Sequence, residues 1–215
     1  MPPEKEETDE ERNRASGEYQ AMRKYREKYG FGAFAMSVYP EEMMRQAGAA
    51  DLDANPNNKL MLELSKAQAL AYIKARETCE GAAARKVLGL NVRSGADLLS
   101  QFITARDEAV AAELDSDPKL VELATAMATC LKGKGYAVSD TKPTAVADRG
   151  APFAGEYAKF QRSGQPLTAQ QARPYLNREI KAALDDLECG KDFYPEFEPR
   201  KLKIAQQVAQ KFGRS

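Results

Sequence analysis

The sequence predicts an all-α protein, a single-domain irregular bundle of seven or eight helices. Apolar residues recur every three or four positions along most of the 215-residue chain, which is the spacing of one helical face. No segment alternates apolar and polar residues over more than four or five positions, as a half-buried strand would. Hydrophobic residues make up 43% of the chain, so a core of ordinary size is expected.

The first part of the chain is predicted to form a charged lead-in and then helices. The polar start is expected to be a disordered lead-in over residues 1–10, followed by one helical domain over residues 11–215. One helix is predicted over residues 9–29, with Gly30 as its stop. "FGAFAMSVY" is expected to be a loop or a single extended segment. Pro40 then opens a brief helix, because proline suits the first helical position.

Three helices are predicted in the middle of the chain, each opened by a capping residue. Ser65 heads "SKAQ", a capping-box pattern, and its helix continues to Gly89 unless Gly81 breaks it. Ser94 caps the following helix. Asp117, followed directly by proline, starts the third.

The last third of the chain contains the longest segment without helical periodicity. Residues 136–152 are punctuated by proline and glycine and are expected to be irregular. "FAGEYAKFQRSG" predicts a short helix. Thr168 then heads a capping box whose helix reaches Cys189, with a kink expected at Pro174. Pro199 is predicted to start the final helix.

Composition excludes several classes of function. The chain has no histidine, which removes Ser-His-Asp and Cys-His machinery and the commonest metal ligand. Its 32 basic and 32 acidic residues do not provide the basic field of a dedicated nucleic-acid binder. The basic C-terminal segment is interpreted as a solvated helix face and tail. No apolar run approaches the roughly 20 residues that span a bilayer, and no signal peptide is visible.

Any enzyme would depend on carboxylates, tyrosine, lysine or cysteine. "DDLE" places Asp185, Asp186 and Glu188 together on one helix, whereas acid–base catalysis needs two carboxyl groups that face each other across a cleft. Other side chains that a cleft could recruit are Glu63, Glu77, Tyr157, Lys159 and Tyr175. None of them stands in a catalytic pattern, so no catalytic residue is predicted.

Two patterns resemble metal sites without completing one. The first ligand spacings of an EF-hand are repeated by Asp51, Asp53, Asn55 and Asn57. Pro56 and Leu62 then stand where that loop needs glycine and a bidentate glutamate, so an Asx-rich turn is the preferred interpretation. Soft ligands for an ion such as Cu(I) are Met36, Met43, Met44, Met127 and Cys130. Methionines on helical faces are usually core residues, and no metal or cofactor is predicted.

The segment "CLKGKGYAV", residues 130–138, has two interpretations. A phosphate-binding loop would need a preceding strand and a following serine or threonine, and both are missing. A helix end accounts for the same residues: Gly133 or Gly135 adopts the left-handed conformation, and the lysines complement the negative end of the helix. Tyr136 or Val138 then folds back onto the last turn.

The three cysteines, Cys79, Cys130 and Cys189, lie in or at the ends of predicted helices, close to glycines. They are either free buried thiols or include one long-range disulfide, which would stabilise the fold by about 2–4 kcal/mol. Because three is an odd number, one thiol stays free or has a partner outside this chain.

Four segments occur in an order that resembles a known layout: "KYGFGAF", "NPNNKLMLELSKAQALAYIKARETCEGAA", "ATCLKGKGYAV" and "RPYLNREIKAALDDLEC". They cover most of residues 25–190 and are similar to uncharacterised secreted proteins and lipoproteins of actinobacteria. The resemblance implies an exported, often lipid-anchored domain with no established enzymatic role. It also implies at least one disulfide and a removed export signal, with "PPEKEETDEE" as a tether to the membrane anchor.

The chain departs from that family near its start. Such proteins often carry a further cysteine in a "C-M-x-x-x-G" element, where this chain has "SGEYQAMRKY". One of the three thiols therefore lacks the usual partner. The pairing stays open between Cys79–Cys189, Cys130–Cys189 and Cys79–Cys130.

Three hypotheses about function follow. The first is a non-catalytic extracytoplasmic domain, secreted or lipid-anchored, that binds an envelope protein or a ligand. Its expected contacts are exposed aromatic residues on two punctuated loops, with anchoring of the loops in the core as the alternative: Phe31, Phe34, Tyr39, Phe193, Tyr194 and Phe197. The second is an enzyme with carboxylates and tyrosine in a helical cleft, where Glu63, Glu77 or Asp186 would have a raised pKa. The third is a cytosolic helical regulator or scaffold with reduced cysteines. No nucleic-acid partner is expected, and the membrane is contacted only through a removed lipid anchor.

Overall fold

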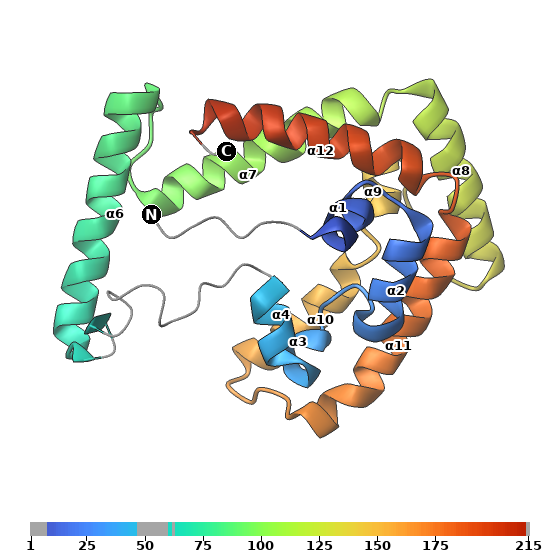
Figure 1. Ribbon diagram of the computed structural model, residues 1–215, viewed down its shortest axis with the longest axis horizontal. Coiled ribbons are helices and arrows are strands. Elements are labelled where there is room, and N and C mark those ends of the chain that lie inside the picture. The colour runs from blue at the N-terminus through green and yellow to red at the C-terminus, as the bar shows by residue number, and fades with distance from the viewer. Residues whose placement is uncertain (1–7, 47–59, 62, 214–215) are drawn as a thin grey trace. The chain divides into compact units, whose positions relative to one another are not determined.

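The computed structural model of the chain describes residues 8–46, 60–61 and 63–213. These residues form eleven helices and no strand, which confirms the all-α class (Figure 1). The helices are α1 (Asp9–Ala15), α2 (Tyr19–Tyr29), α3 (Ala35–Val38), α4 (Pro40–Gln46), α6 (Lys66–Leu88), α7 (Gly95–Leu114), α8 (Pro118–Gly133), α9 (Pro143–Ala147), α10 (Ala151–Arg162), α11 (Ala169–Cys189) and α12 (Tyr194–Lys211). The expected seven or eight helices are too few, because three short helices were not predicted as separate elements.

The described residues group into two compact units. We call them the α6 unit, which holds residues 60–61, 63–112 and 203–213, and the α11 unit, which holds residues 8–46 and 113–202. The single domain expected over residues 11–215 is not tested by this division and stays a prediction. The expected disordered lead-in covers residues 1–10. Within it, Thr8 caps α1, which begins at Asp9, so residues 8–10 form the start of a helix.

The α6 unit is built on one long helix and a tight corner. Helix α6 continues through Gly81, which is buried, so the break considered there does not occur. A Cβ atom at Gly81 would lie 2.5 Å from the Arg93 carbonyl oxygen, which explains why this position carries no side chain. Glycine therefore lets the segment before α7 pass directly against α6.

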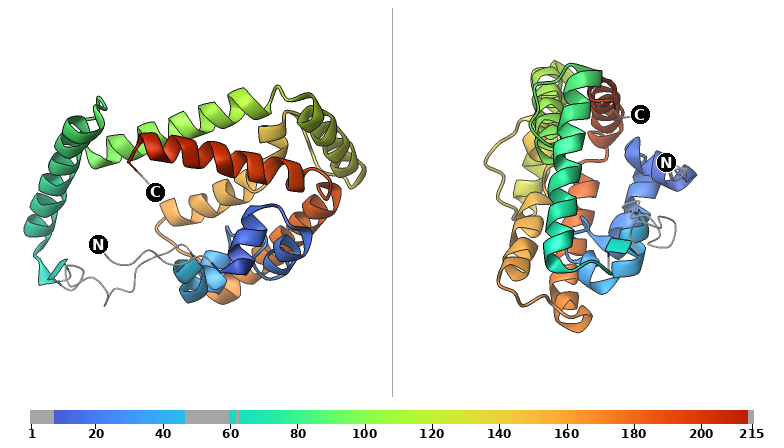
Figure 2. Two further views of the ribbon diagram at one scale, coloured as in Figure 1. Left: turned by 45° about the horizontal axis from the view of Figure 1, so that its top comes forward. Right: turned by 90° about the vertical axis from the view of Figure 1, so that its left-hand side faces the viewer.

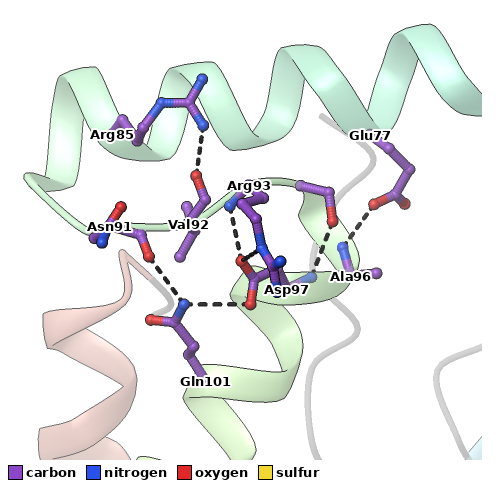
Figure 3. Close-up of polar contacts among 9 residues, drawn as sticks. Glu77, Arg85, Asn91, Val92, Arg93, Ala96, Asp97 and Gln101 are labelled. Carbon is purple, nitrogen blue, oxygen red and sulfur yellow. Dashed lines mark hydrogen bonds and ion pairs between the residues drawn. The ribbon is translucent and has the colours of Figure 1, made fainter.

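Polar contacts hold this corner (Figure 3). Arg85 of α6 donates to the Val92 carbonyl group, and Glu77 accepts the backbone N–H of Ala96 at 2.6 Å. Asp97 accepts the backbone N–H of Arg93 at 2.8 Å, and Ser94 caps α7 as predicted, with 3.1 Å between its Oγ and the N of Asp97. Backbone groups at the corner thus receive partners from both helices.

In the α11 unit, α11 packs against α2, α3 and α8 (Figures 1 and 2). Its core is filled by large side chains that are at most 2% exposed: Leu120, Met127, Leu131, Leu176, Leu187, Phe193 and Phe197. The start signals predicted at Asp117 and Thr168 are confirmed. Helix α11 runs through Pro174, where the expected kink stays a prediction.

The helix expected over residues 9–29 is two helices, α1 and α2. The chain turns at Gly17, whose φ of +80° is a conformation that L side chains rarely adopt. A Cβ atom at Gly17 would lie 2.3 Å from the carbonyl oxygen of Tyr194. The carboxylate of Glu18 then caps α2 by accepting the N–H groups of Gln20 and Ala21. Close approach to α12, which the local periodicity does not show, is the reason for the break.

The segment "FGAFAMSVY" contains α3 and is neither a loop throughout nor an extended strand. Glu179 of α11, which is fully buried, accepts the N–H groups of Ala33 and Phe34 at 2.8 and 2.9 Å. Gly30 lies against the same side chain, because a Cβ atom there would be 2.7 Å from Cγ of Glu179. A long-range carboxylate therefore organises the start of α3, as an N-terminal anion does for any helix.

Two further boundaries differ from the predictions. The stretch 136–152 contains α9 and the start of α10, because Pro143 and Pro152 occupy early helical positions. Helix α12 begins at Tyr194, not at Pro199. The Gly190 carbonyl oxygen accepts the N–H of Tyr194 at 2.9 Å, so the turn after α11 leads directly into α12.

Candidate functional site

A buried polar network lies where α2, α11 and the start of α12 meet. Arg26 donates from Nη1 to Oδ2 of Asp186 at 2.6 Å and to the carbonyl oxygen of Ala183 at 2.8 Å. The hydroxyl group of Tyr194 donates to the same oxygen of Asp186. The guanidinium carbon of Arg26 also lies 4.8 Å from the centre of the Tyr194 ring. Three side chains from three helices thus share one ion pair.

Burial dominates the electrostatics of this network. It raises the pKa of Asp186, although Arg26 and Tyr194 both favour the charged carboxylate. It also raises the pKa of Tyr194 well above its ordinary value. The Oδ1 atom of Asp186 is buried and has no hydrogen-bond partner in the described part of the chain. Asp186 is only 1% exposed, so a bound molecule does not reach this acid in the present structure.

The three acidic side chains of "DDLE" lie in three different environments. Asp185 accepts hydrogen bonds from Lys134, Lys181 and Tyr136, and these donors hold its pKa well below the usual value. Asp186 is in the core, and Glu188 is exposed, where it accepts the hydroxyl group of Tyr19 at 2.9 Å. The sequence placed these acids together, but the structure does not bring any two of them to one reaction site.

The other side chains considered for catalysis have different surroundings. Glu63 is exposed, and Glu77 belongs to the α6–α7 corner described above. Tyr157 makes a 3.2 Å hydrogen bond with Ser37, whereas Tyr175 stacks on Phe34 at a centroid distance of 5.0 Å. Lys159 lies exposed on α10.

Two hollows on the surface of the α11 unit share one side chain, Phe31. The first, which we call the Arg14 hollow, has a volume of about 220 Å³ and is lined by residues that include Arg14, Tyr25, Arg26 and Phe31. The second, the Phe153 hollow, has a volume of about 190 Å³. Its apolar lining is formed by Phe31, Leu131, Pro152, Phe153 and Ala182, and its polar groups belong to Tyr136 and Arg149.

The expectation of six exposed aromatic contacts is wrong for four of them. Phe34, Phe193, Tyr194 and Phe197 are at most 1% exposed. Phe193 stacks on Phe197 at a centroid distance of 4.9 Å, and the turn that holds them is closed by the start of α12. The glycines and prolines beside these aromatic residues mark helix boundaries within the core, not loops raised above the surface.

The two remaining aromatic residues are partly exposed. Tyr39 contacts Tyr29 edge-on at 5.7 Å. Phe31 packs against Phe153 at a centroid distance of 5.7 Å and lines both hollows. Their role in binding stays a prediction, and Phe31 is the better placed of the two.

One disulfide joins Cys130 at the end of α8 to Cys189 at the end of α11, with 5.6 Å between the two Cα atoms. The alternatives Cys79–Cys189 and Cys79–Cys130 are wrong. Packing of α8 against α11 places the ends of these two helices together. Cys79 is free and exposed on α6.

The glycine-rich end of α8 is a helix cap. Gly135 has a φ of +87°, the N–H of Gly135 donates to the Lys132 carbonyl group, and the N–H of Tyr136 donates to Leu131, both at 3.0 Å. This pair of bonds is the Schellman motif. The interpretation of "CLKGKGYAV" as a helix end is therefore confirmed. Lys134 forms an ion pair with Asp185 of α11.

Some of the possible metal ligands lie in the part of the chain that the structure describes, and the others lie outside it. Asp51, Asp53, Asn55, Pro56, Asn57 and Leu62 lie outside the described residues. Among the described residues, no group of three His, Cys, Asp or Glu side chains could hold a metal ion. Cys130 is oxidised, Met43 and Met127 are buried, and Met36 and Met44 are exposed.

The fold and site define an all-helical, disulfide-bonded chain with small surface hollows, two of which share Phe31. No protein family, no curated protein and no solved structure matches it. Among the helices of the described part, none has the length and apolarity to cross a membrane.

Sequence reasoning missed Arg26, Glu179 and Arg149. Arg26 follows Met22 by four residues, so it lies on the buried face of α2 and is itself only 8% exposed. A cation in an apolar stripe is a signal that could have been found. Glu179 gives the same kind of signal, because it lies between Leu176 and Ala183 on the buried face of α11. Arg149 stands in no such pattern.

Proposed function

We propose that the chain is a non-catalytic helical binding domain of the extracytoplasmic space, and that it binds its ligand at Phe31. The observation that carries the proposal is the position of this side chain. Phe31 is partly exposed and lines both the Arg14 hollow and the Phe153 hollow. A rigidly held aromatic side chain between two hollows suits recognition, because it offers a large contact area at a low cost in entropy.

The surroundings of Phe31 support a preformed site. Its backbone belongs to the turn that wraps around Glu179, and Gly150 packs closely against it: a Cβ atom at Gly150 would lie 3.1 Å from Cβ of Phe31. The guanidinium of Arg26 lies 5.3 Å from the ring centre. These contacts hold the ring in one orientation before any ligand arrives.

Two observations support the remaining parts of the proposal. The acids considered for this part of the unit have structural partners. Glu198, which lines the Arg14 hollow, pairs with Lys201 at 3.0 Å. Asp186 pairs with Arg26, and Glu179 accepts hydrogen bonds from backbone N–H groups. This arrangement favours binding over catalysis. The Cys130–Cys189 disulfide favours an oxidising compartment, where such bonds persist.

A fragment screen by NMR on the full chain tests the binding site. Fragments of varied charge and shape are expected to shift the amide signals of residues around Phe31. Phe31→Ala should abolish those shifts, whereas Tyr39→Ala should not, because Tyr39 is also a partly buried aromatic residue but lines neither hollow. Unchanged binding by the Phe31→Ala variant, or no fragment at either hollow, would contradict the proposal.

The compartment has its own test. Cells that produce the protein naturally are quenched in acid and their thiols are alkylated in denaturant. One labelled cysteine, Cys79, is expected for an exported protein. Labelling of all three cysteines would favour the cytosolic regulator or scaffold instead.

A further inference from the structure

The Phe153 hollow has the size and lining of a site for a small apolar group. Its volume is about 190 Å³, and its walls are mainly the side chains of Phe31, Leu131, Pro152, Phe153 and Ala182. An apolar protein cavity of roughly 150 Å³ is large enough to hold benzene. A phenyl ring or a branched alkyl group therefore fits this hollow.

Cations lie over every aromatic ring of the hollow. Arg26 lies 5.3 Å from the ring centre of Phe31, and Arg178 lies 5.8 Å from that of Phe153. Arg149 and Lys181 both lie 5.9 Å from the ring centre of Tyr136. The hollow is thus apolar at its walls and has cationic side chains around them.

Three of these four cations have a carboxylate partner. Arg26 pairs with Asp186, and Lys181 pairs with Asp185. Arg178 forms an ion pair with Glu156. Their charges are largely compensated within the α11 unit.

Arg149 is the cation that lines the hollow itself and has no ion pair among the described residues. Its one hydrogen bond there runs from Nη1 to the carbonyl oxygen of Ala137, at 2.9 Å. A guanidinium has five N–H donors, so several are left for an incoming anion. Arginine binds carboxylates with two parallel hydrogen bonds where the geometry permits.

We infer that the Phe153 hollow binds a small carboxylate whose apolar end is a phenyl or branched alkyl group. The apolar end packs against Phe31 and Phe153, which line the hollow side by side, and the carboxylate binds the Arg149 guanidinium. This inference rests on the proposed function, because it names the ligand class of the site at Phe31. The charge at the edge of the hollow selects the head group, and the volume limits the tail.

Three probes of nearly equal shape separate charge from apolar packing: 3-phenylpropanoate, 3-phenylpropanamide and 3-phenylpropylamine. Titrations followed by NMR on the full chain are expected to rank the carboxylate first, about tenfold tighter than the amide, with the amine weakest. The preference should shrink as salt is added, because it is electrostatic.

Two variants locate the interaction. Arg149→Gln should leave amide binding unchanged and remove the preference for the carboxylate, while the matched control Arg162→Gln, on the exposed end of α10, should keep it. Ala182→Leu fills the hollow and should weaken all three probes. Circular dichroism and the dispersion of amide signals show whether Ala182→Leu stays folded, and Arg149→Gln tests the inference without altering the core.

The outcomes separate the two proposals. Equal binding of carboxylate and amide by the unaltered protein, or a preference that survives Arg149→Gln, overturns the ligand class but leaves binding at Phe31 standing. Failure of all three probes to bind overturns the ligand class too, and then the fragment screen decides whether binding at Phe31 also falls.

Discussion

Arg26 of α2 and Asp186 of α11 are separated by 160 residues in the chain and form a buried ion pair, with 2.6 Å between Nη1 and Oδ2. The side chain of Arg26 is 10% exposed and that of Asp186 is 1% exposed. A buried pair of this kind adds little net stability compared with an apolar pair, but loss of one partner leaves a charge without compensation.

Arg26→Met is therefore expected to destabilise the α11 unit by about 3–5 kcal/mol. The matched control is Arg23→Met on the same helix. Arg23 is half-exposed and pairs with Glu27 at 2.8 Å, so its loss should change the stability much less. Urea unfolding measures both values. Similar losses for the two variants would show that Arg26 does not depend on its buried partner.

The neighbours Asp185 and Asp186 are expected to give opposite pH dependences of stability. The pKa of Asp185 is lowered by Lys134 and Lys181, so its contribution is present above the unfolded pKa of about 3.9 and is lost as the pH falls toward the folded pKa. The pKa of Asp186 is raised by burial, so its contribution is fully present below the unfolded pKa and is lost as the pH rises toward the folded pKa.

Asp185→Asn and Asp186→Asn measure the two effects. The stability difference between the unaltered protein and Asp185→Asn should increase with pH below about 4, and the difference for Asp186→Asn should decrease with pH above about 4. Urea unfolding at a series of pH values gives both curves. Slopes of the same sign would refute the assignment of one acid to the surface and the other to the core.

Removal of the disulfide should destabilise the α11 unit. The bond links residues 59 positions apart, and a cross-link of this span contributes about 2–4 kcal/mol, chiefly by restricting the unfolded chain. Cys130→Ser with Cys189→Ser should therefore lower the free energy of unfolding by that amount. Cys79→Ser, on an exposed face of α6, is the control and should change it by less than about 0.5 kcal/mol. Equal effects would mean that the native disulfide does not involve Cys130 and Cys189.

Gly17 and Gly135 separate steric contact from backbone conformation. Both have positive φ, at +80° and +87°, but a Cβ atom at Gly17 meets the Tyr194 carbonyl group, whereas nothing lies within 4 Å at Gly135. Gly135→Ala should cost about 1–2 kcal/mol from conformation alone. Gly17→Ala should cost clearly more, and thermal unfolding compares them. Equal costs would mean that the α1–α2 turn does not press against α12.

Local signals predicted the helix starts well. Ser65, Ser94, Asp117 and Thr168 were identified from neighbours within four residues, and each one caps the expected helix. The same reasoning failed at Gly17 and at the start of α3. Those backbone changes depend on Tyr194 and Glu179, which lie far along the chain.

The candidate site was predictable only in part. Phe31 was named from its position in an aromatic, glycine-punctuated segment, and it does line both hollows. Phe34, three residues later, has the same surroundings in the sequence but stacks on Tyr175 in the core. Arg149 gave no signal, because its importance depends on its place in the lining of the Phe153 hollow, which only the packing of distant segments creates.

The sequence by itself determined the all-α class, most helix starts and the glycine cap after Cys130, because hydrogen bonds within a helix and at its ends join residues a few positions apart. Only the tertiary structure decided that Cys130 pairs with Cys189, that Asp186 is buried with Arg26 while Asp185 stays at the surface, and that four of six aromatic residues are in the core. These outcomes depend on which helix faces pack together. That choice is made by burial and charge pairing over the whole α11 unit, and no short stretch of sequence contains it.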